Sequence, residues 1–158
     1  MVPMSPADAL PHISAILAEG GSCRLVITGN SMLPFLRDKR DGVILIPPTG
    51  EIQRDEIVFY LRSPNVCVLH RVWQVNPDGS FLICGDAQTA LEPIRREQIL
   101  ARISHIERNG HSIPVSSPLL RLQVRLWRWL YPVRPRMLAL LRRLHLIHIA
   151  SDSNRQSS

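Results

Sequence analysis

The sequence lacks several features that would place it in a special class of protein. No run approaches the roughly 18 to 20 apolar residues of a bilayer-spanning helix, and the N-terminus has neither the basic region nor the apolar region of a secretory signal. The cysteines form no CxxC pair and lie inside apolar runs, which predicts buried free thiols and a reducing compartment: Cys23, Cys67 and Cys84. We therefore expect a cytoplasmic or peripherally membrane-associated protein.

Lysine is almost absent, since the chain contains only Lys39, within the charged stretch Arg37–Asp41. A lysine acts as a general base only when burial lowers its pKa, and a solvated charge run keeps its ammonium protonated. The sequence thus argues against a serine-lysine catalytic pair. It also argues against a metal site, because the histidines other than His70 have no cysteine or histidine partner at ligand spacing, and no cofactor is expected.

What the sequence does have is the composition of an ordinary globular domain. The 158 residues are 45% apolar and 20% charged, and a chain of this length buries roughly 70% of its unfolded surface. The net charge of +6 is unevenly distributed: residues 1–116 hold eleven basic and twelve acidic side chains, whereas residues 117–150 hold seven arginines and no acid. The basic character therefore belongs to one segment.

Hydrophobic periodicity predicts a mainly β protein with helices at both ends. Apolar residues recur at helical spacing over residues 5–19, with Ser5 or Asp8 as a candidate cap. Short β-branched runs separated by turn residues predict six strands: Arg24–Thr28, Val43–Ile46, Glu56–Leu61, Val66–Val75, Ser80–Cys84 and Ile99–Ile106. Asn76–Gly79 is a hairpin signal, because Asp-Gly tolerates the positive φ of tight turns, so the strands beside it should pair antiparallel.

These patterns divide the chain into four segments. We expect an N-terminal helix at 1–21, a β domain at 22–116, a basic amphipathic helical segment at 117–150 and a disordered polar tail at 151–158. The β domain is almost neutral and the helical segment is strongly basic, so the two need separate explanations.

The helical segment at 117–150 has an apolar face and an arginine face. Leucines and a tryptophan share the first: Leu119, Leu122, Leu126 and Trp129. Arginines share the second: Arg121, Arg125 and Arg128. Pro132 and Pro135 should break this helix, with a second one beginning at Arg136. Three interpretations remain open, namely a cap on the β domain, a helix on an anionic membrane surface and a nucleic-acid arm, of which the last is disfavoured.

Two places in the β domain hold candidate catalytic groups. Between Thr28 and Pro34 a glycine and small polar residues interrupt a strand, a pattern that presents the Ser31 hydroxyl at a turn. Near neutral pH that hydroxyl needs an adjacent base. His70 is the best candidate, because it interrupts an otherwise apolar strand and an imidazole pKa near 6.5 suits a base at physiological pH.

An acid is expected beside this histidine. The segment Gly85–Gln88 ends the strand that should pair with the His70 strand, and a carboxylate there can orient the imidazole. Asp86 is the obvious choice, but Glu92 lies in the same loop and can reach the site instead. Arg71 is interpreted as structural, pairing with an acid across the sheet.

Together these motifs resemble a known peptidase family. Gly-x-Ser-Met-x-Pro at 29–34, His-Arg at 70–71 and Gly-Asp at 85–86 are similar to the S24/S26 serine peptidases, and among them to the Ser-His branch of the signal peptidase I superfamily, found in archaea, endomembranes and some bacteria. The resemblance covers roughly Arg24 to Glu107. It implies a twisted antiparallel β domain of the signal-peptidase or LexA-like kind, which needs no cofactor.

The resemblance also implies roles for the matching residues. Ser31 would attack the scissile carbonyl and its backbone N–H would help stabilise the oxyanion, while His70 would act as base where the Ser-Lys branch has lysine. Gly29, Met32 and Pro34 would form the substrate-binding turn, with Met32 lining the pocket.

The acidic position departs from the family pattern. The family's Gly-Asp is usually followed by asparagine and then by a second catalytic acid, and here Ala87 and Glu92 occupy those two positions. Either Asp86 or Glu92 is therefore expected to orient His70.

The implied activity is that of a serine endopeptidase, which cleaves a leader or signal-type peptide by acyl transfer and binds it as an extended strand with small side chains at the scissile bond. The sequence shows no N-terminal membrane span, which favours a cytoplasmic leader peptidase, and no helix-turn-helix domain, which argues against self-cleavage. The alternative is a catalytically inactive module of the same fold that binds peptides or a membrane surface.

Overall fold

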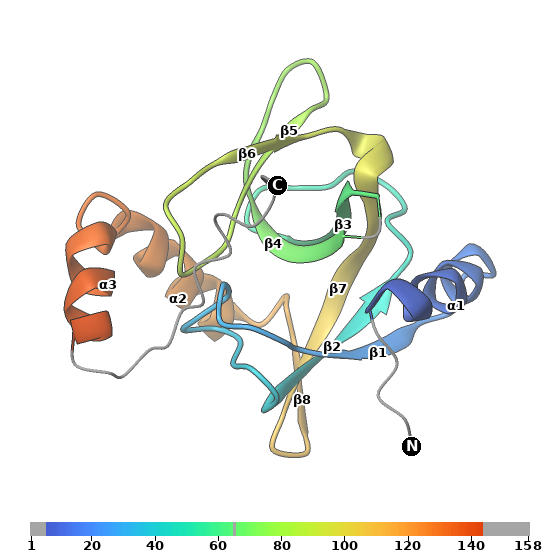
Figure 1. Cartoon of the computed structure of the whole chain (residues 1–158), viewed down its shortest axis with the longest axis horizontal. Helices are drawn as coiled ribbons and strands as arrows, with labels where there is room; N and C mark the ends of the chain where they lie inside the picture. The colour runs from blue at the N-terminus through green and yellow to red at the C-terminus, as the bar shows by residue number, and fades with distance from the viewer. Residues whose placement is uncertain (1–5, 65, 144–158) are drawn as a thin grey trace, which may run out of the picture.

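One antiparallel sheet with helices on two sides makes up this protein (Figure 1), as described by a computed structural model for residues 6–64 and 66–143. In chain order the elements are α1 (Pro6–Ala18), β1 (Cys23–Val26), β2 (Asp41–Ile46), β3 (Ile57–Ser63), β4 (Val66–Val75), β5 (Phe81–Cys84), β6 (Glu92–Ile94), η1 (Arg96–Gln98), β7 (Ile99–Arg108), β8 (His111–Pro114), α2 (Pro118–Trp129) and α3 (Arg134–Arg143). The predicted mainly β class is confirmed. The expected tail at 151–158 lies outside the described residues.

All six strands expected from the sequence are present, and β4 has the predicted bounds. β4 and β5 pair antiparallel around the Asn76–Gly79 turn, as predicted. The strands that the sequence did not predict are β6 and β8, which have three and four residues and each contain a proline. Proline cannot donate a ladder hydrogen bond, so such short segments have little strand character on their own.

The strand order is β1-β2-β7-β3-β4-β5-β6, with β8 paired to β7. β3 lies inside this order and contributes side chains to two hydrophobic clusters: Ile57 and Phe59 join the first, whereas Val58 and Tyr60 join the second. Because successive strand residues point to opposite faces, the two clusters lie on opposite faces of β3. Helix α1 covers the first cluster with Ile13 and Leu17, and it lies beside β1 in Figure 1.

The charged stretch Arg37–Asp41 is not uniformly solvated, contrary to the expectation from sequence. Lys39 is exposed, but Asp41 is 1% exposed and accepts hydrogen bonds from Arg40 and Arg108. Its carboxylate also accepts from the backbone N–H of Arg37 at 2.9 Å. Burial alone would raise the pKa of Asp41, but these bonds outweigh it and lower the pKa to about 2. Asp41 thus ties the start of β2 to the end of β7.

Helix α2 packs on the β domain with a different face from the one the leucine pattern indicated. Val124 is buried, and the Trp127 indole N–H donates to the backbone carbonyl of Asp86 at 2.8 Å. Arg128, expected on the outer arginine face, instead bonds Asp55 and stacks 3.9 Å over the Trp73 ring. The predicted leucine face is exposed to solvent. No helix among the described residues is long and apolar enough to cross a bilayer.

Helix α3 begins at Arg134 rather than at the expected Arg136. Pro135 does not break it, because proline is tolerated in a first turn, where its missing N–H would be unpaired in any case. The Arg134 guanidinium is 2% exposed and donates to the carbonyls of Gln88 and Trp127. This buried arginine joins α3 to the loop that follows β5.

Candidate active site

Ser31 lies in a turn held from both sides. Gly29, two residues before it, has φ +86, a left-handed conformation that glycine adopts without strain, and its N–H donates to Asp38 at 2.8 Å. After Ser31, the Leu36 N–H donates to the carbonyl of Met32 at 2.9 Å. Ser31 itself is partly exposed and lies within this constrained backbone.

Met32 is buried in the core, whereas the family resemblance implied a place in the substrate pocket. It is 2% exposed and packs in the first hydrophobic cluster with Leu36 and Ile27. Pro34 is exposed within the turn. Met32 thus anchors the turn in the core.

The Gly85–Ala87 loop packs directly against the Ser31 turn. The Ala87 N–H donates to the backbone carbonyl of Ser31 at 2.8 Å. A Cβ added to Gly85 would lie 2.7 Å from that same carbonyl oxygen, closer than real Cβ contacts. The glycine of the Gly-Asp motif is therefore required by the close approach of two loops.

Asp86 is bound to Arg71 and not to the histidine. The Arg71 guanidinium donates to both carboxylate oxygens, at 2.8 and 2.7 Å, and to the Asp55 carbonyl at 2.8 Å. It also stacks 5.1 Å from the Phe35 ring, which belongs to the Ser31 turn. The expected pairing of Arg71 with an acid is confirmed. Asp86 accordingly positions the loop that supports Ser31.

His70 lies on the opposite face of β4 from Arg71, in a buried polar chain. It is 3% exposed, and its Nδ1 lies 3.3 Å from the Tyr60 hydroxyl. That hydroxyl donates to Glu92 at 2.8 Å, and Arg62 binds both carboxylate oxygens of Glu92. Of the two acids expected near the histidine, Glu92 is thus the one connected to it, through Tyr60.

This chain favours one histidine tautomer. Because the Tyr60 hydroxyl donates to Glu92, the tautomer of His70 that can bond the Tyr60 oxygen carries its hydrogen on Nδ1 and leaves Nε2 with its lone pair. Burial, reinforced by the charge of Arg62 and opposed by Glu92, lowers the pKa of His70 to about 4. The imidazole is therefore neutral at pH 7, the form that a general base needs.

Acidification should unfold the protein partly through this histidine. Between the ordinary pKa of about 6.5 and the folded value of about 4, the unfolded chain holds a proton that the folded chain does not, so lowering the pH favours unfolding. The difference corresponds to about 3 kcal/mol. Urea titrations at pH 7 and pH 4 should show His70→Gln losing less stability on acidification than the wild type, by about that amount. Equal pH dependence in the two proteins would contradict a buried, neutral His70.

Tyr60 and Arg62 were missed by the sequence analysis. Both lie on β3, which pairs antiparallel with β4 so that Val58 faces His70 across the ladder. Tyr60 is therefore diagonal to the histidine on the same face, within reach of an aromatic side chain. The alternation of Val58 and Tyr60 on the predicted strand Glu56–Leu61, with Arg62 directly after it, was the available signal, but its use requires the register.

The comparisons with known proteins add no family to this geometry. The chain matches no protein-family model, and no curated protein matches its sequence. The candidate site therefore depends on its residues alone.

The four candidate catalytic residues form two pairs. Ser31 is joined to the Gly85–Ala87 loop, and His70 is joined to Glu92 through Tyr60. Asp86 lies in the connection between β5 and β6, and Glu92 is the first residue of β6 rather than a loop residue, so one short stretch of chain contributes to both pairs. Within residues 6–64 and 66–143 no hydrogen bond joins the Ser31 hydroxyl to His70. The β4 side chain that contacts the Ser31 turn is Arg71, and it points to the face opposite His70.

Neither the cysteines nor a metal cluster offers an alternative site. Cys84 is buried, whereas Cys23 and Cys67 are only partly buried, so the expectation of buried free thiols is correct for one of the three. Burial raises the pKa of Cys84 to about 11, which makes it a poor nucleophile. The described part of the chain contains no group of three side chains able to hold a metal ion.

Proposed function

We propose that this protein is a serine endopeptidase that cleaves a leader or signal-type peptide, with Ser31 as nucleophile and His70 as general base. The observation that supports this most is the buried His70–Tyr60–Glu92 chain, which keeps an imidazole neutral and favours one tautomer. Such an arrangement is costly for a fold to maintain, since buried polar groups need partners. It has the form of a base oriented by a carboxylate, here with a tyrosine hydroxyl between them.

The proposed reaction proceeds by acyl transfer. His70 Nε2 takes the Ser31 proton as the serine oxygen forms a bond to the scissile carbonyl carbon, and the resulting imidazolium gives that proton to the departing amine as the C–N bond breaks. Water, deprotonated by the same histidine, then hydrolyses the ester and restores Ser31. Glu92 stabilises the transient imidazolium through Tyr60, while Asp86 and Arg71 hold the loop behind the nucleophile.

The substrate would bind as an extended strand along β1. This strand lies at one end of the strand order, pairs with β2 among the described strands, and leads directly into the Ser31 turn. An extended peptide that added to its outer edge would be directed toward Ser31 by main-chain hydrogen bonds. Gly29 offers an open surface there, because a Cβ at this position would meet no heavy atom within 4 Å.

Covalent labelling tests the nucleophile. Wild-type protein exposed to a serine-reactive acylating probe should gain one adduct by intact-mass spectrometry, and Ser31→Ala should gain none, because the attacking oxygen is absent. Ser104→Ala is a matched control that removes a partly buried serine on β7 and should be labelled as fully as the wild type. Equal labelling of Ser31→Ala and the wild type would refute the proposal.

A second candidate function is a peptide-binding module of the same fold that has no catalytic activity. The missing hydrogen bond between Ser31 and His70 in the described residues favours it, since an inactive fold need not bring the two together. In that case the wild type would retain a peptide without turnover and the probe would leave no adduct on Ser31.

A further inference from the structure

Helix α2 presents to solvent an apolar face that nothing in the described structure covers. The exposed fractions on this face are large: Leu119 66%, Leu122 54%, Leu126 55% and Trp129 79%. At 100° per residue these four side chains span about 80° of the helix circumference. The face that packs on the domain, which includes Val124 and Trp127, lies on the other side. The hydrophobic stripe therefore does not belong to the core.

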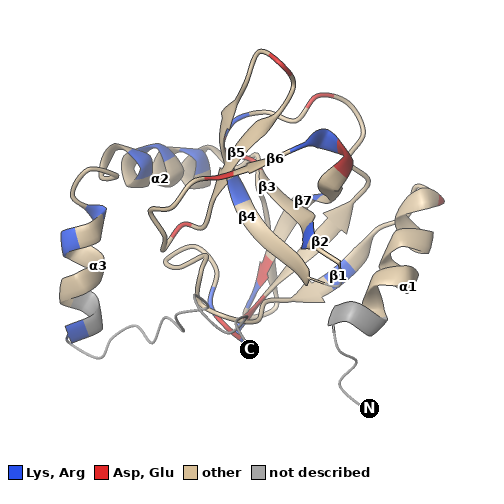
Figure 2. Cartoon of the chain, turned by 45° about the horizontal axis from the view of Figure 1, so that its top comes forward, with Lys and Arg blue, Asp and Glu red and all other residues tan. Residues whose placement is uncertain are grey.

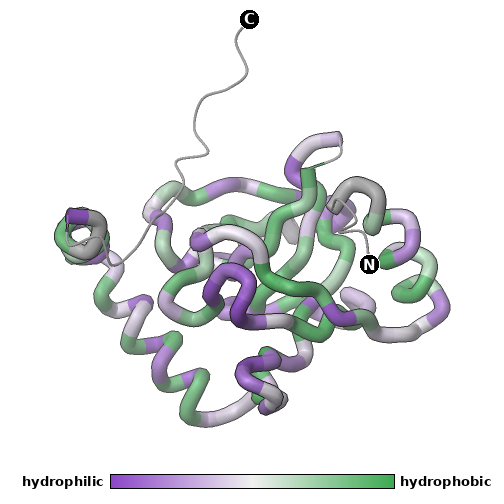
Figure 3. The backbone as a smooth tube through the Cα atoms, turned by 60° about the horizontal axis from the view of Figure 1, so that its bottom comes forward, coloured by the Kyte–Doolittle hydropathy of each residue, from purple (hydrophilic) through white to green (hydrophobic). Residues whose placement is uncertain are grey.

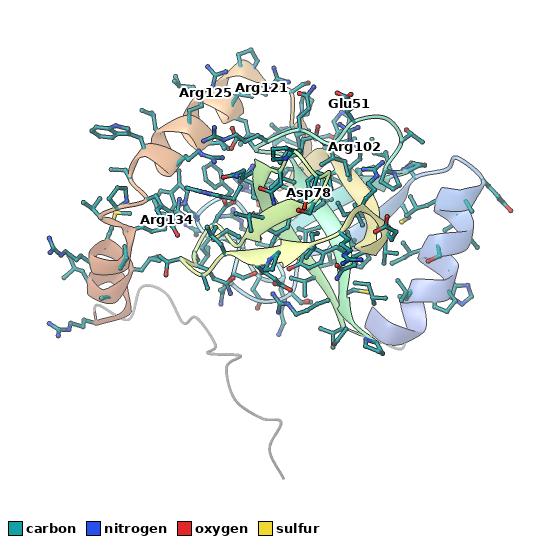
Figure 4. All side chains as sticks on the ribbon, turned by 90° about the horizontal axis from the view of Figure 1, so that it is seen from above. Glu51, Asp78, Arg102, Arg121, Arg125 and Arg134 are labelled. Atoms are coloured by element: carbon teal, nitrogen blue, oxygen red, sulfur yellow. The ribbon has the colours of Figure 1, made fainter. Side chains whose placement is uncertain are left out.

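Arginines border this stripe and lead into a groove. Arg121 and Arg125 lie on α2 between the exposed stripe and the packed face, and they line a groove of about 350 Å³ between α2 and the sheet. Figure 4 shows the two side by side on α2, with Arg102 on the neighbouring part of the sheet. Arg54 lines the same groove.

Three of the groove's arginines have no acidic partner. Its acids are already engaged, because Glu56 pairs with Arg102 and Asp55 pairs with Arg128. Arg71, which also lines the groove, pairs with Asp86. Among the described residues no ion pair is formed by the remaining cations: Arg54, Arg121 and Arg125. The groove thus has an excess of positive charge next to an apolar ridge.

We propose that α2 is an interfacial helix that binds the surface of an anionic bilayer. Its leucines and Trp129 enter the boundary between headgroups and acyl chains, and the groove formed by Arg54, Arg121 and Arg125 receives lipid phosphate. Tryptophan is favoured at this boundary because its ring is amphipathic. Figure 2 shows basic residues alternating with uncharged ones along α2, and Figure 3 shows hydrophobic residues alternating with hydrophilic ones along the same helix.

The charge distribution favours a bilayer over the other occupants. Residues 117–150 hold seven arginines and no acid, so a second copy docking through this face would bring like charges together. Nucleic acid would satisfy the arginines but would leave the apolar stripe in water. A bilayer containing anionic lipid meets both needs at once. The proposal does not depend on the proposed peptidase activity.

Flotation with vesicles tests the proposal on the full chain. Wild-type protein should float with phosphatidylcholine vesicles that contain ~30 mol% phosphatidylglycerol, because this mixture has a strongly negative surface. It should remain below vesicles of phosphatidylcholine alone. The double variant Arg121→Gln, Arg125→Gln should bind about 30-fold more weakly, since each arginine near an anionic surface contributes roughly a factor of five. The double variant Leu122→Ser, Leu126→Ser should lose at least as much.

Matched controls separate this surface from general basicity and stickiness. Arg95→Gln removes an exposed charge next to η1, which lies across the sheet from α2 in Figure 1, and Val75→Ser removes an exposed apolar side chain from β4. Both should float like the wild type. The proposal is overturned if the α2 variants also float like the wild type, or if the wild type stays below anionic vesicles. It is equally overturned if sedimentation shows a dimer that the leucine variant dissociates.

Discussion

Replacing His70 with alanine is expected to slow the acylation of Ser31 by about 10²- to 10⁴-fold, the contribution typical of a positioned general base. The neutral imidazole has its Nδ1 hydrogen directed to Tyr60, so Nε2 is the atom that can accept the serine proton. Without it, proton removal falls to water. The rate constant of adduct formation is measured by intact mass at several probe concentrations. Its maximal value should fall, whereas the probe concentration that gives half of that maximum should change little.

Two variants set the scale for this effect. Tyr60→Phe keeps the ring but cuts His70 from Glu92, and it should slow acylation by about five- to tenfold, since one neutral hydrogen bond contributes about 1 kcal/mol. His105→Ala removes a partly buried histidine on β7 whose imidazole, within the described part of the chain, hydrogen-bonds its neighbour Ser104, and it should leave the rate unchanged. Acylation of His70→Ala at the wild-type rate would exclude His70 as the base.

Replacing Asp41 with alanine is expected to lower the free energy of unfolding by about 2 to 4 kcal/mol, because it removes one partner of a buried charge network. Arg40 and Arg108 would lose their shared carboxylate, and the Arg37 N–H would lose its acceptor. The expected loss of stability is smaller than the full cost of a buried unpaired charge, since about a third of each arginine side chain is exposed. Urea denaturation at pH 7 measures it.

The pH dependence gives this prediction a second readout. The folded pKa of Asp41, about 2, is below its ordinary value of 3.8, so its contribution is complete above pH 3.8 and is lost as the pH falls toward 2. The difference in the free energy of unfolding between the wild type and Asp41→Ala should decrease as the pH falls over that range. Glu107→Ala is the control, because it breaks a more exposed pair with Arg24 and should cost less than about 1 kcal/mol. An equal loss in both variants would contradict a special role for Asp41.

The β domain was largely predictable because its strands alternate clearly. β4 was placed at its observed bounds, since an apolar run precedes a strong turn signal, and the pairing of β4 with β5 followed from that turn. The Ser31 turn and the Gly-Asp loop were recognised from residue types whose conformational properties are local. Gly85 shows why such motifs are informative, because its close approach to the Ser31 carbonyl excludes any side chain.

The parts that could not be predicted depend on register and on burial. Asp86 was the obvious candidate in sequence and Glu92 the alternative, and only the pairing of β3 with β4 places Tyr60 between His70 and Glu92. Likewise the exposed leucine face of α2 was indistinguishable from a core face, since amphipathic periodicity does not say which face meets the domain. Asp41 looked solvated because its neighbours in sequence are charged.

The alternation along β4 makes this strand unusually intolerant of changes in length. His70 and Arg71 point to opposite faces, so inserting one residue before them would place the arginine in the second hydrophobic cluster and the histidine against Asp86. His70 and Arg71 would then lose their bonding partners at the same time, which no single substitution achieves. Insertions at the exposed tip Pro77–Gly79 would leave every pairing intact. Natural variants of this chain should therefore differ in length at that tip and keep the length of β4 constant.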